Sequence, residues 1–178
     1  IALGLEGRRM GAMSAHFNRL GDQALGHISA VLQSNPNSPW ALGVLGAWNI
    51  EIVARGGAGA ARLFYGASRR RGIDAYNQAI ALAPENLVLQ YERALTYLSL
   101  DPVELEPEAM SGLAVAIAIP SKDALEFEIS SRCQLLKSAV ERHELPALAV
   151  LLVHLRGNYE KAEDFWPRRI FDRASRGK

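Results

Sequence analysis

The single cysteine, Cys133, is the first residue to consider, because a thiolate beside a histidine can act as a nucleophile. His143 and His154 are the candidate bases that follow it in the sequence. Cys133, however, falls in an apolar stripe at helical spacing, where a lone cysteine is usually a core residue. With one thiol, the chain forms neither an internal disulfide nor a multi-cysteine zinc site.

A second candidate for chemistry is the acidic run of Glu104, Glu106 and Glu108, which could hold a cation or act as acid and base. A simpler role is available to these glutamates, because negative side chains favour the N-terminus of a helix and a helix is predicted from residue 106. None of the four histidines forms a pair at the four-residue spacing that places two imidazoles on one helical face. We therefore predict that the protein is not an enzyme and has no catalytic residue, no metal site and no cofactor.

The stretch RGGAGAARLFYGASRRR, residues 55–71, is rich in glycine and arginine. A dinucleotide-binding loop requires a preceding strand, and a phosphate-binding loop ends in Gly-Lys-Ser or Gly-Lys-Thr; here a helix is predicted before the glycines and neither ending follows. The pattern favours an extended connection whose glycines relax the backbone. The alternative is a loop that binds an anion or a partner, since no acid lies between Glu51 and Asp74. Its candidate residues are Arg62, Arg69, Arg70 and Arg71.

The elements around these residues are predicted to be helices throughout, because apolar residues recur at spacings of three and four and no period-two runs are found. Proline-containing turns such as SNPNSPW and LAPENL mark the boundaries. The expected helices, about nine in number, cover residues 4–19, 21–34, 39–54, 67–82, 86–100, 106–118, 122–141, 145–155 and 158–173.

Charge and hydropathy narrow the classes of partner. The formal net charge is +1, which gives no overall electrostatic case for nucleic acid or an anionic membrane. No window reaches the roughly 18–20 apolar residues of a membrane span. The chain begins with Ile1 rather than Met, which leaves open the removal of an N-terminal segment. We expect a soluble protein, either cytoplasmic or bacterial periplasmic.

Three helix junctions in the sequence resemble one another: AVLQSNPNSPWALGVLGAWN, QAIALAPENLVLQYERALTY and AVAIAIPSKDALEFEISSRC. Each has an apolar helix end, a proline, a polar turn and then a helix with a small residue, which is Gly46, Ala94 or Ser130. Within YNQAIALAPENLVLQYERALTY, the positions of Tyr76 and Ala79 make the chain similar to the tetratricopeptide repeat family.

The resemblance implies an all-α, right-handed superhelix of antiparallel helix hairpins in a single domain over residues 1–178. Its approximate units are 4–34, 39–83, 86–119 and 122–155, with a C-terminal capping helix at 158–173. The 14 residues in excess of a standard repeat form an insertion at 55–68.

In the family, the first helix of each hairpin lines a concave groove. The residues placed there by the resemblance are apolar or aromatic, and the candidates are Trp40, Ala47, Tyr91, Leu95, Phe127 and Ser131. The expected function is a scaffold that binds a protein or peptide of unidentified sequence, or a second copy of the chain. The alternative is a soluble ligand-binding component, similar to the tetratricopeptide subunits of solute transporters. An enclosed pocket would favour the ligand, and an open apolar patch would favour the protein partner.

Overall fold

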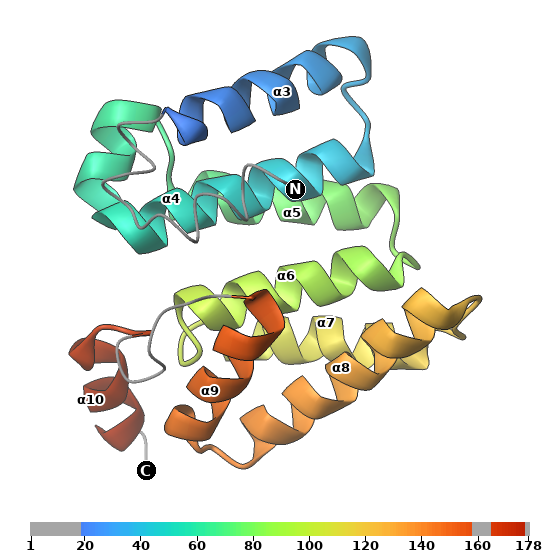
Figure 1. The fold of residues 1–178 in the computed structure, drawn as a ribbon, viewed down its shortest axis with the longest axis vertical. Coiled ribbons are helices and arrows are strands. Elements are labelled where there is room, and N and C mark those ends of the chain that lie inside the picture. The colour runs from blue at the N-terminus through green and yellow to red at the C-terminus, as the bar shows by residue number, and fades with distance from the viewer. Residues whose placement is uncertain (1–18, 158–164, 177–178) are drawn as a thin grey trace. The chain divides into compact units, whose positions relative to one another are not determined.

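The computed structural model describes residues 19–157 and 165–176, and every regular element in these ranges is a helix (Figure 1). The helices are α3 (Leu20–Ser34), α4 (Pro39–Tyr65), α5 (Arg69–Leu82), α6 (Leu87–Leu100), α7 (Glu106–Ala118), α8 (Ala124–Glu141), α9 (Leu145–Arg156) and α10 (Arg168–Arg176). The all-α prediction is therefore confirmed. The helix predicted at 4–19 lies almost wholly outside the described residues, as do residues 158–164 of the predicted capping helix.

The chain divides into two compact units, Ile1–Pro84 and Glu85–Lys178, and we describe each by itself. The division falls in the turn between α5 and α6. None of the helices in the described part of the chain is long and apolar enough to cross a membrane.

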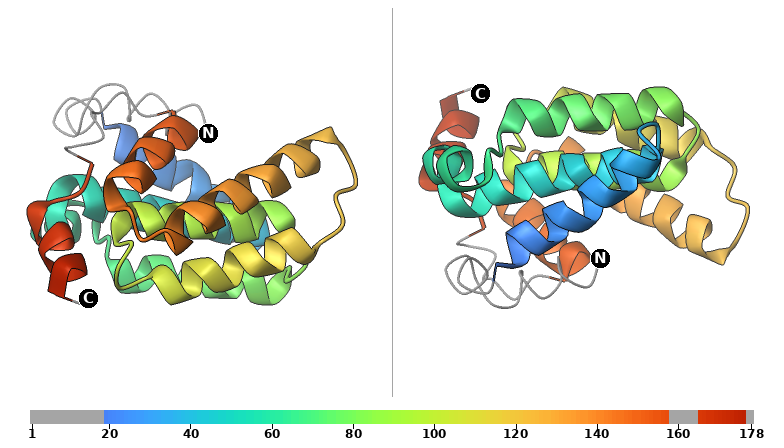
Figure 2. Two further views of the ribbon diagram at one scale, coloured as in Figure 1. Left: turned by 90° about the horizontal axis from the view of Figure 1, so that it is seen from below. Right: turned by 90° about the horizontal axis from the view of Figure 1, so that it is seen from above.

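In the first unit, α4 lies between α3 and α5 (Figure 1 and Figure 2). It begins at a strong start signal: Pro39 follows Ser38, whose side chain accepts a hydrogen bond from the backbone N–H of Ala41. A similar cap starts α5, where the Ser68 hydroxyl accepts from the N–H of Arg71.

The prediction of an extended connection over residues 55–68 is wrong, because α4 continues as helix to Tyr65. Gly57 alone departs from helical geometry, with φ 75° and ψ 156°, and kinks the helix. The residues on either side of Gly57 remain helical, since alanine, arginine and leucine around the glycines are good helix formers. The segment ends at Gly66, whose φ of 62° is the left-handed conformation of a C-terminal cap.

The hairpin of α4 and α5 closes over two glycines. A Cβ atom on Gly46 would lie 2.5 Å from Cδ2 of Tyr76 and 3.0 Å from the carbonyl oxygen of Gly72. A Cβ atom on Gly72 would in turn lie 2.6 Å from Cγ1 of Ile50. The two helices are therefore as close as their backbones allow, and the Tyr76 ring covers the crossing.

The second unit contains the hairpins α6–α7 and α8–α9, with α8 packed against both helices of the first hairpin. Asn86 caps α6 by accepting from Leu89 N–H, and Asp123 caps α8 by accepting from Glu126 N–H. Ala94, the small residue expected at a crossing, has no exposed surface.

The C-terminal helix α10 is fixed to the α6–α7 connection. The carboxylate of Asp101 accepts hydrogen bonds from the backbone N–H groups of Val103 and Glu104 and from the guanidinium of Arg173. Trp166, just before α10, donates from its indole to the carbonyl of Ser99 at 3.0 Å. These contacts give α10 a defined place in the second unit.

Candidate functional site: a pocket in the first unit

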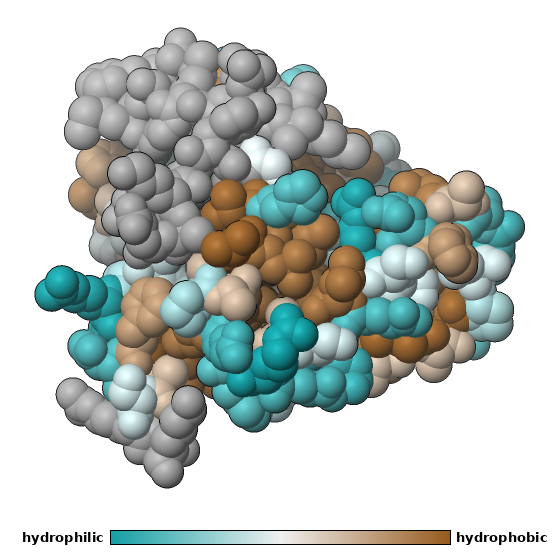
Figure 3. Space-filling model, turned by 60° about the horizontal axis from the view of Figure 1, so that its bottom comes forward, coloured by the Kyte–Doolittle hydropathy of each residue, from teal (hydrophilic) through white to brown (hydrophobic). Residues whose placement is uncertain are grey.

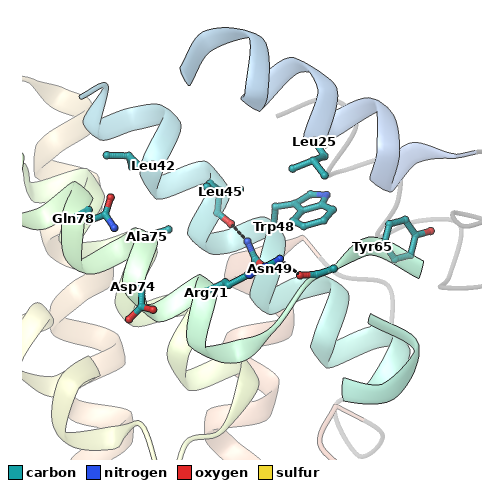
Figure 4. A pocket seen from close by; sticks show the side chains of 11 residues that line it. Leu25, Leu42, Leu45, Trp48, Asn49, Tyr65, Arg71, Asp74, Ala75 and Gln78 are labelled. Atoms are coloured by element: carbon teal, nitrogen blue, oxygen red, sulfur yellow. Dashed lines mark hydrogen bonds between the residues drawn. The ribbon is translucent and has the colours of Figure 1, made fainter. Parts of the chain in front are cut away.

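A half-open pocket of about 340 Å³ lies among the three helices of the first unit (Figure 4). Its apolar lining comes from α3, α4 and α5, and its polar lining comes from α4, α5 and the turn between them. The lining residues are Leu25, Leu42, Leu45, Trp48, Asn49, Tyr65, Gly66, Arg71, Asp74, Ala75 and Gln78.

Trp48 is the largest part of the apolar wall, and two contacts fix its ring. Its indole N–H donates to the carbonyl of Gly21 on α3 at 3.0 Å. Tyr65 packs edge-on against it, with ring centroids 6.2 Å apart and planes at 82°. Because Trp48 is held from two sides, the wall that it forms is present without a ligand.

Tyr65 comes from the end of α4 and reaches the pocket because of the kink at Gly57. Its ring packs against Gly21, where a Cβ atom would lie 2.8 Å from Cε1 of the tyrosine. Burial, with a contribution from Asp22, raises the pKa of the Tyr65 phenol above its ordinary value. The returning end of α4 thus forms the end wall of the pocket.

Asn49 is a buried polar residue with its hydrogen-bonding groups engaged on both sides. Its side-chain N–H donates to the carbonyl of Leu45 at 3.0 Å, and its side-chain oxygen accepts from Ser68 N–H at 3.1 Å. These bonds tie α4 to the start of α5 and satisfy an amide that would otherwise be costly to bury. We infer that Asn49 holds the pocket in shape.

Arg71 carries the positive charge of the pocket. Its Nη1 donates to the carbonyl of Gly66 at 2.5 Å, and within the described part of the chain its guanidinium pairs with no carboxylate. The nearby Asp74 pairs instead with Arg70, at 3.8 Å between Nε and Oδ2. In Figure 4 the Arg71 side chain runs towards Asn49, whereas Asp74 points the other way.

Among the arginines predicted to bind an anion or partner, the structure places only Arg71 in the pocket. Arg62 and Arg70 are exposed elsewhere, and Arg69 is half-buried. The expected arginine surplus is also smaller than the sequence indicated. Arg55 pairs with Glu51 at 3.2 Å one helical turn away, as Arg70 does with Asp74.

The predicted groove residues of the first unit lie on another side of α4. Trp40 is 50% exposed and Ala47 is half-buried. At about 3.6 residues per turn, both face away from the side that carries Leu42, Leu45 and Asn49. A groove over Trp40 and Ala47 stays a prediction, separate from the pocket.

In the second unit, the predicted groove residues divide between core and surface. Tyr91 and Leu95 on α6 are buried, and Phe127 on α8 is 66% exposed. Ser131 is half-buried, and its hydroxyl donates to the carbonyl of Phe127. The Tyr91 hydroxyl lies beside the guanidinium of Arg132, and burial raises the pKa of Tyr91 to about 12. Tyr91 and Leu95 thus lie in the core and Phe127 at the surface, and a groove over these residues stays a prediction.

The candidate nucleophile is poorly suited to attack. Cys133 has no exposed surface, and burial raises the pKa of its thiol to about 12. Within the described residues, no cluster of histidine, cysteine or acidic side chains could hold a metal ion.

Sequence reasoning missed the pocket because the segment that closes it was expected to be an extended insertion. A signal was present in the alternation of helix-forming alanines with the glycines of residues 56–61. The contact of Tyr65 with Gly21, 44 positions apart in the sequence, had no local signal.

Comparison with protein-family models, with curated proteins and with solved structures finds no match.

Proposed function

We propose that the protein is a non-catalytic binding module, built from tetratricopeptide-like helix hairpins, and that the pocket of the first unit is its ligand site. The observation that carries the proposal is the lining of the pocket. Trp48 and the leucines offer an apolar wall, while Arg71 offers a charged group at one end. Binding pockets for small molecules commonly combine an apolar lining with a few polar groups in this way.

The close packing of Gly46, Gly72 and Tyr76 supports the hairpin part of the proposal. Small residues at crossings let neighbouring helices approach and stack, as a helical repeat requires.

A blocking substitution tests the proposed site. Gln78 lines the pocket and is exposed, so a Gln78→Trp variant should fold and fill part of the space. Asn77→Trp is the matched control, since Asn77 is exposed on the same helix but outside the lining. We expect the neutral dye 1-aminoanthracene to bind the wild type and Asn77→Trp, and to bind Gln78→Trp more weakly. Equal binding to all three proteins would exclude the pocket as the dye's site.

A second candidate function is the binding of a protein partner or of a second copy. It is favoured by large apolar side chains on α8 and α9 of the second unit: Leu125 is 64% exposed, Phe127 66%, Leu135 57% and Val150 60%. Figure 3 shows apolar side chains gathered at the centre of the face on which α8 and α9 lie. Exposed apolar patches often mark interaction surfaces.

Sedimentation measures the self-association form of this candidate. If a second copy covers α8, the wild type should sediment as a dimer at high concentration, and Phe127→Ser should shift it towards monomer. A wild type that remains monomeric at all concentrations removes self-association from consideration.

A further inference from the structure

We propose that the ligand of the first-unit pocket is a small monocarboxylate with an apolar body, whose carboxylate binds Arg71 and whose body packs against Trp48. This inference rests on the proposed function, because it names the ligand class of the same site.

The carboxylate follows from the unused donors of Arg71. A guanidinium has five N–H groups, and Nη1 of Arg71 is bonded to the Gly66 carbonyl, a neutral acceptor that leaves the positive charge uncompensated. No carboxylate among the described residues pairs with it. A planar carboxylate can take two parallel hydrogen bonds from a guanidinium, which makes it the best match in shape and charge.

The surroundings of Arg71 favour a ligand carboxylate over internal competitors. Asn49, the nearest amide in Figure 4, already gives its side-chain N–H to Leu45 and its oxygen to Ser68. It therefore has little capacity left to satisfy the guanidinium, and the free donors of Arg71 remain available to a ligand.

The position of Asp74 indicates that the ligand carries a single negative charge. This carboxylate also lines the pocket, and it points away from the end at which Arg71 meets Asn49. A ligand with a second negative group would be repelled near Asp74. A monoanion with its charge at one end avoids that repulsion.

The apolar body of the ligand is inferred from the pocket wall on the side away from Arg71. The pocket is lined beside Trp48 by Leu25, Leu42 and Leu45. A ligand that covers these side chains removes their apolar surface from water, which favours binding. The volume of about 340 Å³ is near the lower end of the usual range for small-molecule pockets, about 300–1,000 Å³. The pocket therefore fits a medium-length acyl chain or a single aromatic ring, rather than a whole lipid.

Isothermal titration calorimetry with three probes of equal chain length tests this assignment on the full chain. Octanoate, octanol and octylammonium share a body and differ in the charge of the head. We expect octanoate to bind roughly tenfold or more tightly than octanol, since hydrogen bonds between charged groups are stronger than neutral ones. Octylammonium should bind more weakly than octanol.

The matched variants are Arg71→Gln, Arg71→Lys and Arg62→Gln. Arg62 is exposed and lies outside the pocket lining, whereas Arg70 pairs with the lining residue Asp74, so Arg62→Gln is the variant that removes the same charge without touching the site. Arg71→Gln should remove the preference for octanoate and leave octanol binding unchanged, while Arg71→Lys should keep part of the preference. Arg62→Gln should behave as the wild type.

The outcomes separate the inference from the proposed function. Equal binding of octanoate and octanol by the wild type would overturn the carboxylate assignment and leave the pocket as an apolar site. Binding of none of the three probes would overturn both. Even if Arg71→Gln does not fold, the affinities of octanoate and octanol for the wild type test the carboxylate assignment.

Discussion

The hairpins α4–α5 and α6–α7 each have a glycine where their two helices cross. The side chains that pack against the glycine differ between the two hairpins. In α4–α5, Gly46 faces the ring of Tyr76 and the backbone of Gly72. In α6–α7, a Cβ atom on Gly112 would lie 3.1 Å from Nη2 of Arg93 and 3.4 Å from the Gln90 carbonyl oxygen. One crossing is closed by an aromatic ring and backbone, and the other by a flexible charged side chain.

The polar groups at the α6–α7 crossing do not all have a hydrogen-bond partner. Nη2 of Arg93 donates to the side-chain oxygen of Gln90 at 3.0 Å. The buried Nε atom of Arg93 has no hydrogen-bond partner among the described residues. Because a buried polar group without a partner costs stability, the α6–α7 crossing should be the more adaptable of the two. The same small residue therefore marks a rigid contact in one hairpin and a yielding contact in the other.

The largest expected effect is at Ala94, which has no exposed surface and stands ten residues after Pro84, as Gly46 stands ten after Pro36. Ala94→Leu would force extra volume into a filled site and should lower the free energy of unfolding by about 3 kcal/mol, the upper part of the usual range for overpacking. Urea denaturation followed by circular dichroism measures the change. An unchanged midpoint would mean that Ala94 is not at a tight contact.

Gly46→Ala should have the next largest effect. The added methyl would lie too close to Tyr76 and to the backbone oxygen of Gly72, so one of the helices must shift. We expect the free energy of unfolding to fall by roughly 2 kcal/mol. Gly59→Ala is the control, because nothing lies within 4 Å of its Cβ position and alanine favours the helix; it should stabilise slightly. If the two variants unfold alike, the rigid crossing is absent.

Alkaline pH should destabilise the second unit, because two of its buried side chains, Tyr91 and Cys133, can lose a proton at high pH. The pKa values of Tyr91 and Cys133 are both about 12 in the folded state, whereas an unfolded tyrosine and cysteine ionise near ~10 and ~8.5. The unfolded state therefore loses these protons first, and stability falls as the pH rises above about 8.5. Between pH 8.5 and 10 the loss should be about 1–2 kcal/mol.

The contribution of Cys133 can be isolated with Cys133→Ala. This variant should show a smaller loss of stability over the same pH interval, measured by thermal unfolding at each pH. A pH dependence identical to that of the wild type would show that the thiol is not buried.

The smallest effect is expected for Gly112→Ala. The contact is with the far end of Arg93, which can move, and alanine gains about 1 kcal/mol over glycine in helix propensity. The free energy of unfolding should therefore change by no more than about 0.5 kcal/mol in either direction. A loss as large as that of Gly46→Ala would remove the distinction between the two crossings.

Most of the helix boundaries could be predicted because they are local. Pro39 after Ser38, Asn86 before Leu87 and Asp123 before Ala124 are start signals that the structure uses as caps. Glycine was less informative. Gly57 breaks the helix and Gly56 and Gly59 do not, since the difference lies in the backbone conformation that the surrounding fold imposes.

The pocket could not be predicted from the sequence, because it depends on contacts between distant residues. Trp48 was not among the expected site residues, and its neighbours Gly21 and Tyr65 belong to other segments. Arg71 was expected to bind an anion, and that part of the expectation remains in our proposal. Sequence spacing identifies which side chains share a helical face, but it does not show which returning segment covers that face.

The central claim, that the pocket of the first unit binds a ligand, can be tested by comparing two buried indoles. Trp48 and Trp166 are each hydrogen-bonded through Nε1 to a backbone carbonyl, Trp48 in the pocket and Trp166 in the second unit. Their indole N–H resonances can be followed by ¹H–¹⁵N correlation spectra during titration with octanoate, after assignment with Trp48→Phe and Trp166→Phe. We predict a saturable shift of the Trp48 resonance and none of Trp166. A shift of Trp166 with Trp48 unmoved would contradict the claim.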